Sequence, residues 1–114
     1  MIFAIESNSL CLSLCLLNEE KVIDTYFVSL KNDLTETLIP TIKTFLIKNE
    51  ISFKQISTLT IGCGPGSFTG IRTLISAAKG IVVTNNHIKT IGINSLAALA
   101  MSFINETKKR NIKY

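Results

Sequence analysis

The 114-residue sequence predicts a single α/β domain built on a mixed sheet of five strands. In the first 30 residues, strand-like stretches are separated by short polar turns, which favours an antiparallel meander. After residue 33, stretches with helical spacing alternate with short apolar stretches, as in parallel strands joined by helices. The 46% apolar content fits a sheet covered on both faces, or a surface partly covered by another chain, and the composition leaves both open.

The first three elements are predicted to be strands. Residues 1–5 are wholly apolar, as expected of a buried central strand. Residues 10–17 alternate leucine with smaller side chains, which predicts a half-buried strand with its leucines on one face. Residues 21–30 are rich in β-branched and aromatic side chains, which favour a third strand.

The rest of the chain alternates helices with strands. Asp33 followed by Glu36 resembles a capping box, and apolar spacing then predicts a helix to about residue 49, bent where Pro40 removes a backbone hydrogen bond. Strands are expected at 56–62 and 87–92, a second helix between them to residue 84, and a third helix from Asn94 or Ser95. The order β-β-β-α-β-α-β-α is that of a ribonuclease-H-like or actin-like (ASKHA) lobe.

Charge and cysteine content narrow the class of protein. The net charge of +4 owes much to a basic end at 108–113, which is either a solvated terminus or an RNA contact. Cys11 and Cys15 lie ~13 Å apart on an extended strand, too far for a disulfide. We expect these two cysteines and Cys63 to be reduced, small core residues of a cytoplasmic protein. Because His87 is the sole histidine, we expect no metal site. We also expect no membrane span.

A glycine-rich turn at 62–70 separates a strand from the second helix. Glycines permit positive φ and close backbone approach, and free N–H groups at a helix start can hold an anion. The spacing fits neither a dinucleotide fingerprint, because Ser67 or Thr69 occupies the last glycine position, nor a Walker loop, because Ile71 and Arg72 follow Gly70. The turn therefore predicts either an anion contact or close packing alone.

The run Gly-Pro-Gly-Ser-Phe-Thr-Gly-Ile-Arg at 64–72 resembles the signature of the TsaB (YeaZ-type) family. The segments at 36–40, 77–80 and 91–96 also resemble that family, in register with the signature. The resemblance covers residues 1–105 as an N-terminal actin-like lobe and leaves 106–114 as a basic C-terminal tail. Family members are about twice as long, so the resemblance leads us to expect that the second lobe is missing. A shortened relative, a split reading frame and a decayed gene product stay open.

The resemblance implies a non-catalytic scaffold rather than an enzyme. TsaB pairs with TsaD, which transfers a threonylcarbamoyl group to adenosine 37 of tRNA, and acts with the ATPase TsaE, so tRNA is an indirect partner. It implies no catalytic residue, metal or cofactor. Apolar positions on the first two helices are the expected partner interface, and a homodimer through the same surface stays open: Leu38, Ile42, Ile81 and Val83. The candidate anion contacts are Gly64, Gly66, Ser67, Thr69, Gly70 and Arg72.

The sequence departs from the family pattern at residues 6, 34 and 35, and several other functions stay open. Glu6 stands where the family has Asp, and its longer side chain makes a tuned magnesium site less favourable. Leu34 and Thr35 stand where a His-Ser pair is common, so a metal-binding histidine is absent there. The alternatives are a nucleotide-dependent transferase, a direct tRNA-binding module, a non-functional fragment, and a peptidase. For a peptidase, Ser67 and His87 are poorly placed, because a helix of ~26 Å separates them.

Overall fold

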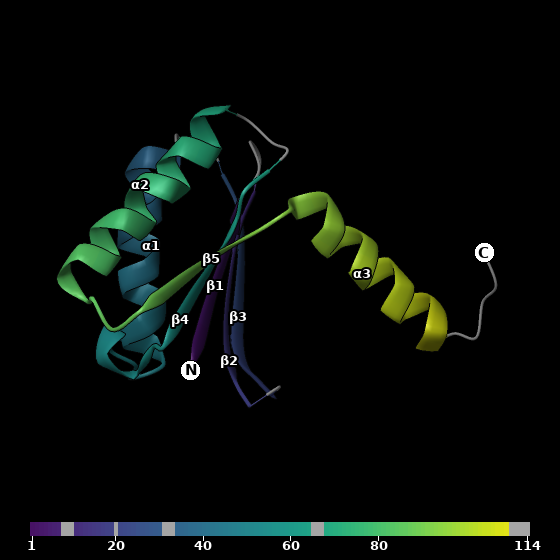
Figure 1. Ribbon diagram of the computed structural model, residues 1–114, viewed down its shortest axis with the longest axis horizontal. Helices are drawn as coiled ribbons and strands as arrows, with labels where there is room; N and C mark the ends of the chain where they lie inside the picture. Colours follow the sequence, from purple (N-terminus) through teal and green to yellow (C-terminus); the bar gives the residue numbers. More distant parts are fainter. Residues whose placement is uncertain (8–10, 20, 31–33, 65–67, 110–114) are drawn as a thin grey trace.

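A computed structural model of the chain describes residues 1–7, 11–19, 21–30, 34–64 and 68–109. The elements follow one another as β1 (Ile2–Ser7), β2 (Cys11–Asn18), β3 (Lys21–Ser29), α1 (Leu34–Lys48), a short 3₁₀ turn (Phe53–Gln55), β4 (Thr58–Gly62), α2 (Phe68–Thr84), β5 (Lys89–Ile93) and α3 (Ser95–Lys109). The strands form one mixed sheet in the order β3-β2-β1-β4-β5. This confirms the predicted five-stranded α/β architecture and its element order (Figure 1).

The central strand β1 joins the antiparallel and parallel halves of the sheet. It pairs with β2 in antiparallel register and with β4 in parallel register, and β5 continues the parallel half. The leucines of β2 at 12, 14 and 16 are all buried, as their alternation predicts. The observed strands begin or end one or two residues away from the expected bounds, and β1 extends to Ser7 rather than ending at residue 5.

The helices α1 and α2 lie on the same face of the sheet and bury the core against it (Figure 1). The ring of Phe45 on α1 stacks on Phe3 of β1, with ring centroids 6.0 Å apart. Leu38 and Ile42 of α1 and Leu74 of α2 complete this layer, each almost wholly excluded from solvent. The helix α1 runs through Pro40, and the predicted capping residue Asp33 lies outside the described residues.

The opposite face of the sheet, which we call the open sheet face, is not covered by α1 or α2. Its centre is a row of paired residues: Thr25, Cys15, Ala4, Thr60 and Ile91. All five are exposed or half-buried, and every residue of β5 is exposed. The expectation that the cysteines are core residues is therefore wrong, because Cys11 and Cys15 point to this face and Cys63 is exposed.

The last helix, α3, stands off the sheet on the side of the open sheet face (Figure 1). From Leu96 to Phe103 every side chain is exposed, so the helix buries little of itself against the domain. The helix continues to Lys109, and the predicted tail at 106–114 is therefore helical over its first four residues. Among the described residues, no helix combines the length and apolarity needed to cross a membrane.

A polar link joins β3 to the last turn of α1. The Asn49 side-chain amide donates to Asp24 Oδ2 at 3.0 Å, and the Lys48 ammonium lies 3.4 Å from the same oxygen. The hydrogen bond from Asn49 is the main cause that holds the pKa of the Asp24 carboxyl below its ordinary value, with a smaller contribution from Lys48. Because Lys48 is largely exposed, its ion pair alone contributes little to stability.

This link predicts a pH dependence of folding. A carboxyl whose pKa is lower in the folded chain stabilises it above the unfolded pKa of about 3.9, and that stability is lost as pH falls through the folded pKa. Substituting Asn49→Ala should raise the Asp24 pKa toward its ordinary value, as measured by NMR titration of the carboxyl. Lys48→Ala is the matched control and should raise it less; a larger rise in Lys48→Ala would contradict this assignment of causes.

Candidate functional site

A polar cluster lies where the parallel strands end, at the edge of the sheet that carries ligands in many α/β proteins. The Ser95 hydroxyl, at the start of α3, lies 3.1 and 3.0 Å from the two carboxylate oxygens of Glu6 at the end of β1. Glu6 Oε1 also accepts from the Ser7 backbone N–H at 3.1 Å. The backbone N–H of Gly64, just past β4, donates to Ser95 Oγ at 3.3 Å. The cluster thus joins three chain segments.

Glycine suits two positions of this cluster, because a side chain there would displace a neighbour or strain the backbone. The Glu6 carboxylate lies over the α-carbon of Gly62, in the space that any side chain at residue 62 would fill. Gly64 has φ of 101°, a backbone conformation that other residues adopt only with strain. The sequence predicted either an anion contact or close packing for the glycine-rich turn, and close packing accounts for Gly62 and Gly64.

The cluster holds α3 in place by its first turn. Besides the Ser95 hydroxyl, the Ser95 N–H donates to the Gly64 carbonyl at 2.8 Å, and the Cys63 N–H to the Ile93 carbonyl at 2.8 Å. The Asn94 side chain caps the helix by accepting from the Ala97 N–H at 3.0 Å. Among the described residues, no three acidic, histidine or cysteine side chains come together as metal ligands. The arrangement makes Glu6 a clamp for α3.

Sequence reasoning did not find this clamp. It singled out Glu6 only as a departure from a metal-binding Asp, and Ser95 only as a helix cap. The two residues are 89 positions apart, and no local pattern links them. The available signal was the conjunction of an acidic residue at the end of one strand with a hydroxyl residue after the last strand, because parallel strands end at one edge.

The residues of the signature turn do not gather at one site in the described structure. Gly64 contacts Ser95, and Gly70 is buried in the first turn of α2. Arg72 is exposed on the outer surface of α2. Gly66, Ser67 and the side chain of Thr69 lie outside the described residues, and the predicted anion contact stays a prediction.

A shallow groove of about 510 Å³ runs between α1 and α2 on the side away from the sheet. The Thr35 and Thr73 hydroxyls bridge the two helices at 3.3 Å, and Leu38 lies buried beneath them. Ile39 rises from one wall with 40% of its surface exposed. The other wall is α2, with mostly small side chains: Arg72, Thr73, Ser76 and Ala77. We call this surface the α1–α2 groove.

Three of the four residues predicted to contact a partner have little exposed surface in this fold, and their role as contacts stays a prediction. Leu38, Ile42 and Ile81 are buried in the chain's own core, since their helical stripes face the sheet. Val83 is 80% exposed, but it borders a different hollow on the far side of α2, with Lys79 and Thr90. Sequence periodicity located the apolar stripes, and the structure places them against the sheet. The exposed residue of the groove that it missed is Ile39.

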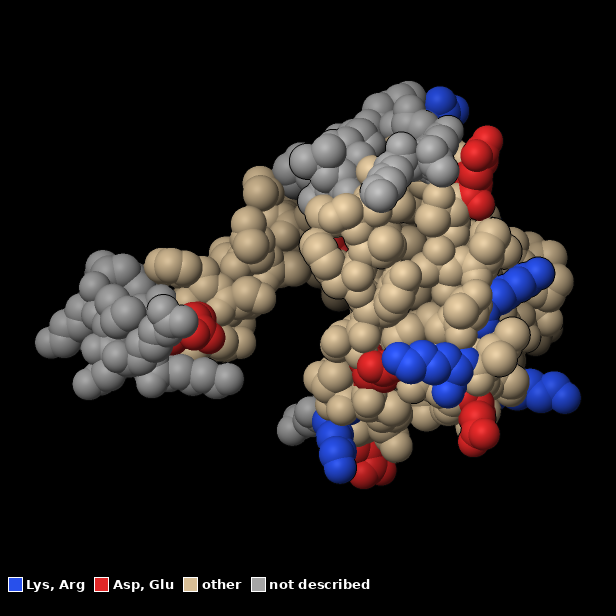
Figure 2. Space-filling view, turned by 180° about the vertical axis from the view of Figure 1, so that it is seen from behind, with Lys and Arg blue, Asp and Glu red and all other residues tan. Residues whose placement is uncertain are grey.

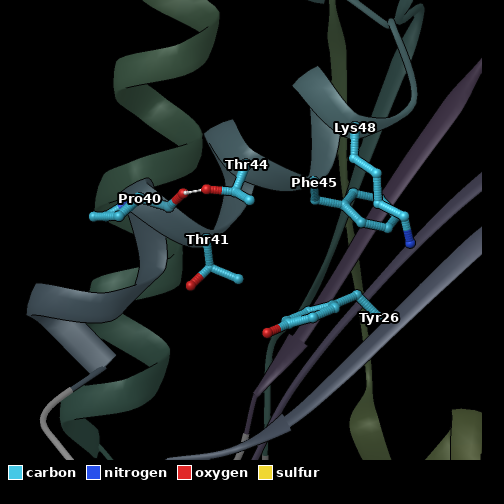
Figure 3. Close-up of a pocket in the computed structure, with 6 residues that line it drawn as sticks. All are labelled: Tyr26, Pro40, Thr41, Thr44, Phe45 and Lys48. Atoms are coloured by element: carbon cyan, nitrogen blue, oxygen red, sulfur yellow. Dashed lines mark hydrogen bonds between the residues drawn. The ribbon is translucent and has the colours of Figure 1, made fainter.

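A second hollow, of about 240 Å³, lies between α1 and β3 (Figure 3). The rings of Tyr26 and Phe45 approach each other there, with centroids 6.3 Å apart. Its two threonine hydroxyls donate to backbone carbonyls of α1, Thr41 to Thr37 at 2.7 Å and Thr44 to Pro40 at 3.0 Å. These bonds use the hydroxyl protons within the helix, so the hollow offers a small aromatic surface together with the polar ends of Tyr26 and Lys48.

Comparison with known proteins agrees across sequence and structure. Residues 29–111 match the family model described as TsaD, tRNA N6-adenosine threonylcarbamoyltransferase. The chain is 32% identical over 94 residues to the tRNA threonylcarbamoyladenosine biosynthesis protein TsaB of Buchnera aphidicola subsp. Schizaphis graminum, covering 82% of this chain and 44% of that protein. It is 30% identical over 99 residues to the TsaB protein of Escherichia coli, covering 87% and 42%.

Solved structures show the same fold. YeaZ from Pseudomonas aeruginosa superposes with a TM-score of 0.81 at 21% identity, over 94% of this chain and 49% of that one. A second structure, of an uncharacterized protein with similarity to peptidase YeaZ from the same organism, gives a TM-score of 0.83 at 21% identity, over the same shares. The chain spans about half the length of the relatives that it matches.

The clamp at the strand ends predicts the effect of a methyl group on stability. Gly62→Ala places its Cβ against the Glu6 carboxylate and should lower the free energy of unfolding by about 1–3 kcal/mol, measured by urea denaturation. Gly80→Ala, in the interior of α2 with open space around it, is the matched control and should raise it by about 0.5–1 kcal/mol. Equal effects at the two glycines would show that Glu6 does not occupy this space.

Proposed function

The chain belongs to the TsaB (YeaZ-type) family, and from this premise we propose that it is a non-catalytic partner of a TsaD-type threonylcarbamoyltransferase. Its place is then in the biosynthesis of threonylcarbamoyladenosine at position 37 of tRNA. The observation that carries the proposal is the α1–α2 groove, an exposed surface formed within the segment that the family model matches.

The shape and chemistry of the groove support binding of a helix from a partner. The side chains of α2 that line it are small apart from Arg72, and Gly80 farther along α2 has open space around it, so a second helix could approach closely. Ile39 supplies an exposed apolar side chain at the rim, and Arg72 a positive charge. An apolar anchor with a charged rim is the usual anatomy of a specific interface.

The strand-end cluster supports a binding role over catalysis. In the actin-like fold an acidic residue near the end of the first strand can hold metal and nucleotide, but here the Ser95 hydroxyl directs its one proton at the Glu6 carboxylate, whose two oxygens lie 3.1 and 3.0 Å away. For the peptidase alternative, a base must reach the nucleophile. The His87 ring lies 3.0 Å from the Phe53 carbonyl, past the end of α2 opposite the signature turn.

The wider assembly follows from the same premise. A TsaE-type ATPase would act on the complex rather than on this chain alone, and tRNA would be contacted through the TsaD-type partner. Residues 1–105 would serve as the actin-like lobe that binds, and the cytoplasm, where tRNA is modified, would be the site of action. No cofactor of this chain's own enters the proposal.

Co-expression with a TsaD-type protein tests the proposal. The two proteins should co-elute in size exclusion, and calorimetry should give a dissociation constant for the pair. Ile39→Glu places a charge in the groove and should weaken binding at least tenfold, or about 1.4 kcal/mol. Ile47→Glu is the matched control, because Ile47 lies on the same helix, is 75% exposed and does not line the groove.

Three results would contradict the proposal. Separate elution of the two proteins would exclude a stable complex, and equal loss of binding in the two variants would move the interface away from the groove. Threonylcarbamoyl transfer to tRNA by the isolated chain would make it an enzyme. The expected activity result is that transfer requires the TsaD-type protein and that Ile39→Glu reduces any stimulation by this chain.

A further inference from the structure

The outer edge of β5 has no strand beside it among the described residues. In the strand order β3-β2-β1-β4-β5 it is the last strand of the parallel half, and every one of its residues is exposed. An edge strand presents a row of backbone N–H and C=O groups with which another extended chain can pair. The edge of β5 therefore offers a place where such a chain could bind.

Thr90 and Gly92 turn their backbone groups toward this edge. The Lys89 N–H and the Ile93 carbonyl both bond to backbone groups of the residues that flank β4, at 2.9 and 2.8 Å. Successive residues of a strand direct their backbone groups to opposite sides of the strand. The N–H and C=O groups of Thr90 and Gly92 therefore point away from the sheet, where they can pair with an added strand.

A hollow of about 480 Å³ lies beside this edge, on the face of the sheet that α2 covers. Its walls expose almost only apolar surface, to which Val83 on α2 contributes a side chain that is 80% exposed. Thr90 supplies the wall from β5. A strand added beside β5 would lie ~4.8 Å from it, so its side chains on this face would stand over the hollow. We call this hollow the β5 hollow; its other lining residues are Ile61, Ile75, Ala78, Lys79 and Val82.

The elements that form this edge carry only positive charge. Between Glu50 and Glu106 the sequence has no acidic residue, and its basic residues are Lys54, Arg72, Lys79 and Lys89. Lys79 lines the β5 hollow, and Lys89 is the first residue of β5. Figure 2, by contrast, shows basic and acidic side chains next to one another on the side of the domain that is turned away in Figure 1. A chain bound along β5 therefore passes two lysines and meets no carboxylate of α2 or β5.

We propose that β5 binds an extended acidic segment of a partner protein as a sixth strand of the sheet. Backbone hydrogen bonds to Thr90 and Gly92 hold the segment along the edge, and its apolar side chains at alternate positions fill the β5 hollow. Its carboxylates lie near Lys79 and Lys89. This surface is separate from the α1–α2 groove, so the inference does not rest on the function proposed for the groove.

The two lysines select an acidic segment over the same edge of a second copy. Lysine at an edge strand is a common protection against pairing between like edges, because the charges of the two copies would meet. An acidic segment gains from the same charges. Two other common protections are missing, since β5 contains no proline and pairs with β4 without a bulge. The edge is thus protected by charge, and opposite charge removes that protection.

Fluorescence anisotropy with two labelled decapeptides and the full chain tests the proposal. One peptide alternates valine with glutamate and the other alternates valine with lysine, so the two have the same pattern and opposite charge. The valine–glutamate peptide should bind at least about tenfold more tightly. Lys79→Glu should remove most of this preference. Lys43→Glu is the matched control and should keep it, because Lys43 is exposed on α1 and does not line the β5 hollow.

A proline in β5 tests the backbone hydrogen bonds. Thr90→Pro removes an N–H group that points away from the sheet, and an edge strand tolerates proline at such a position. Binding of the valine–glutamate peptide should weaken at least about tenfold. Thr90→Val is the matched control, because it keeps the N–H group and a side chain of similar size, and it should bind as the native chain does. Circular dichroism of each variant checks that the domain stays folded.

Amide hydrogen exchange measured by NMR shows whether the bound peptide forms a strand. The valine–glutamate peptide should slow exchange at Thr90 and Gly92. It should leave exchange at Ile91 unchanged, because the Ile91 N–H points toward β4. Binding without slower exchange at Thr90 and Gly92 would show that the peptide does not pair with the edge, and would overturn the proposal.

The remaining outcomes also decide the question. No binding of the valine–glutamate peptide, or equal binding of the two peptides, would overturn the proposal. Slower exchange at Thr90 and Gly92 that rises with protein concentration in the absence of peptide would assign the edge to a second copy, and would equally overturn it. Because binding of the TsaD-type protein is tested through Ile39 and strand addition through Thr90, the failure of either proposal leaves the other measurable.

Discussion

The structure depends on one topological constraint, that α1 and α2 cover the same face of the sheet. After β3 the chain crosses the sheet through α1 to β4 and then through α2 to β5, so both connections run in the same direction. Because such connections are right-handed, the two helices lie on one side of the sheet. The leucines of β2 and the rings of Phe3 and Phe45 fill that layer. The groove between the helices and the uncovered face behind the sheet both result from this arrangement.

The strand-end cluster uses the acidic side chain at the end of β1 for packing. Glu6 stands at the end of the central strand, where an acidic side chain in an actin-like fold could hold a cation. Its carboxylate instead lies over Gly62 and accepts from Ser95, so the charge orients α3. The same contacts fix the direction in which α3 leaves the sheet. In the proposed function, surfaces rather than a catalytic group are the functional elements of this chain.

The sequence predicted the elements well and their surroundings poorly. Periodicity identified each strand and helix, because alternation and 3.6-residue spacing are local properties. Periodicity separates the two faces of β2, but it does not show whether helices pack on one face or on both. Cys11 and Cys15 were therefore expected in the core. In the same way Leu38, Ile42 and Ile81 were recognised as an apolar set but assigned to a partner. The contact between Glu6 and Ser95 joins the two ends of the chain and has no local signal.

The central claim is that the α1–α2 groove carries the function of this chain. Hydrogen exchange followed by mass spectrometry, on the chain alone and bound to a TsaD-type protein, tests it most directly. Binding should slow exchange of backbone amides in the groove segments, 35–41 of α1 and 72–77 of α2, and leave β3 unchanged. Slower exchange confined to β3, or to the strand ends around Glu6 and Ser95, would contradict the account.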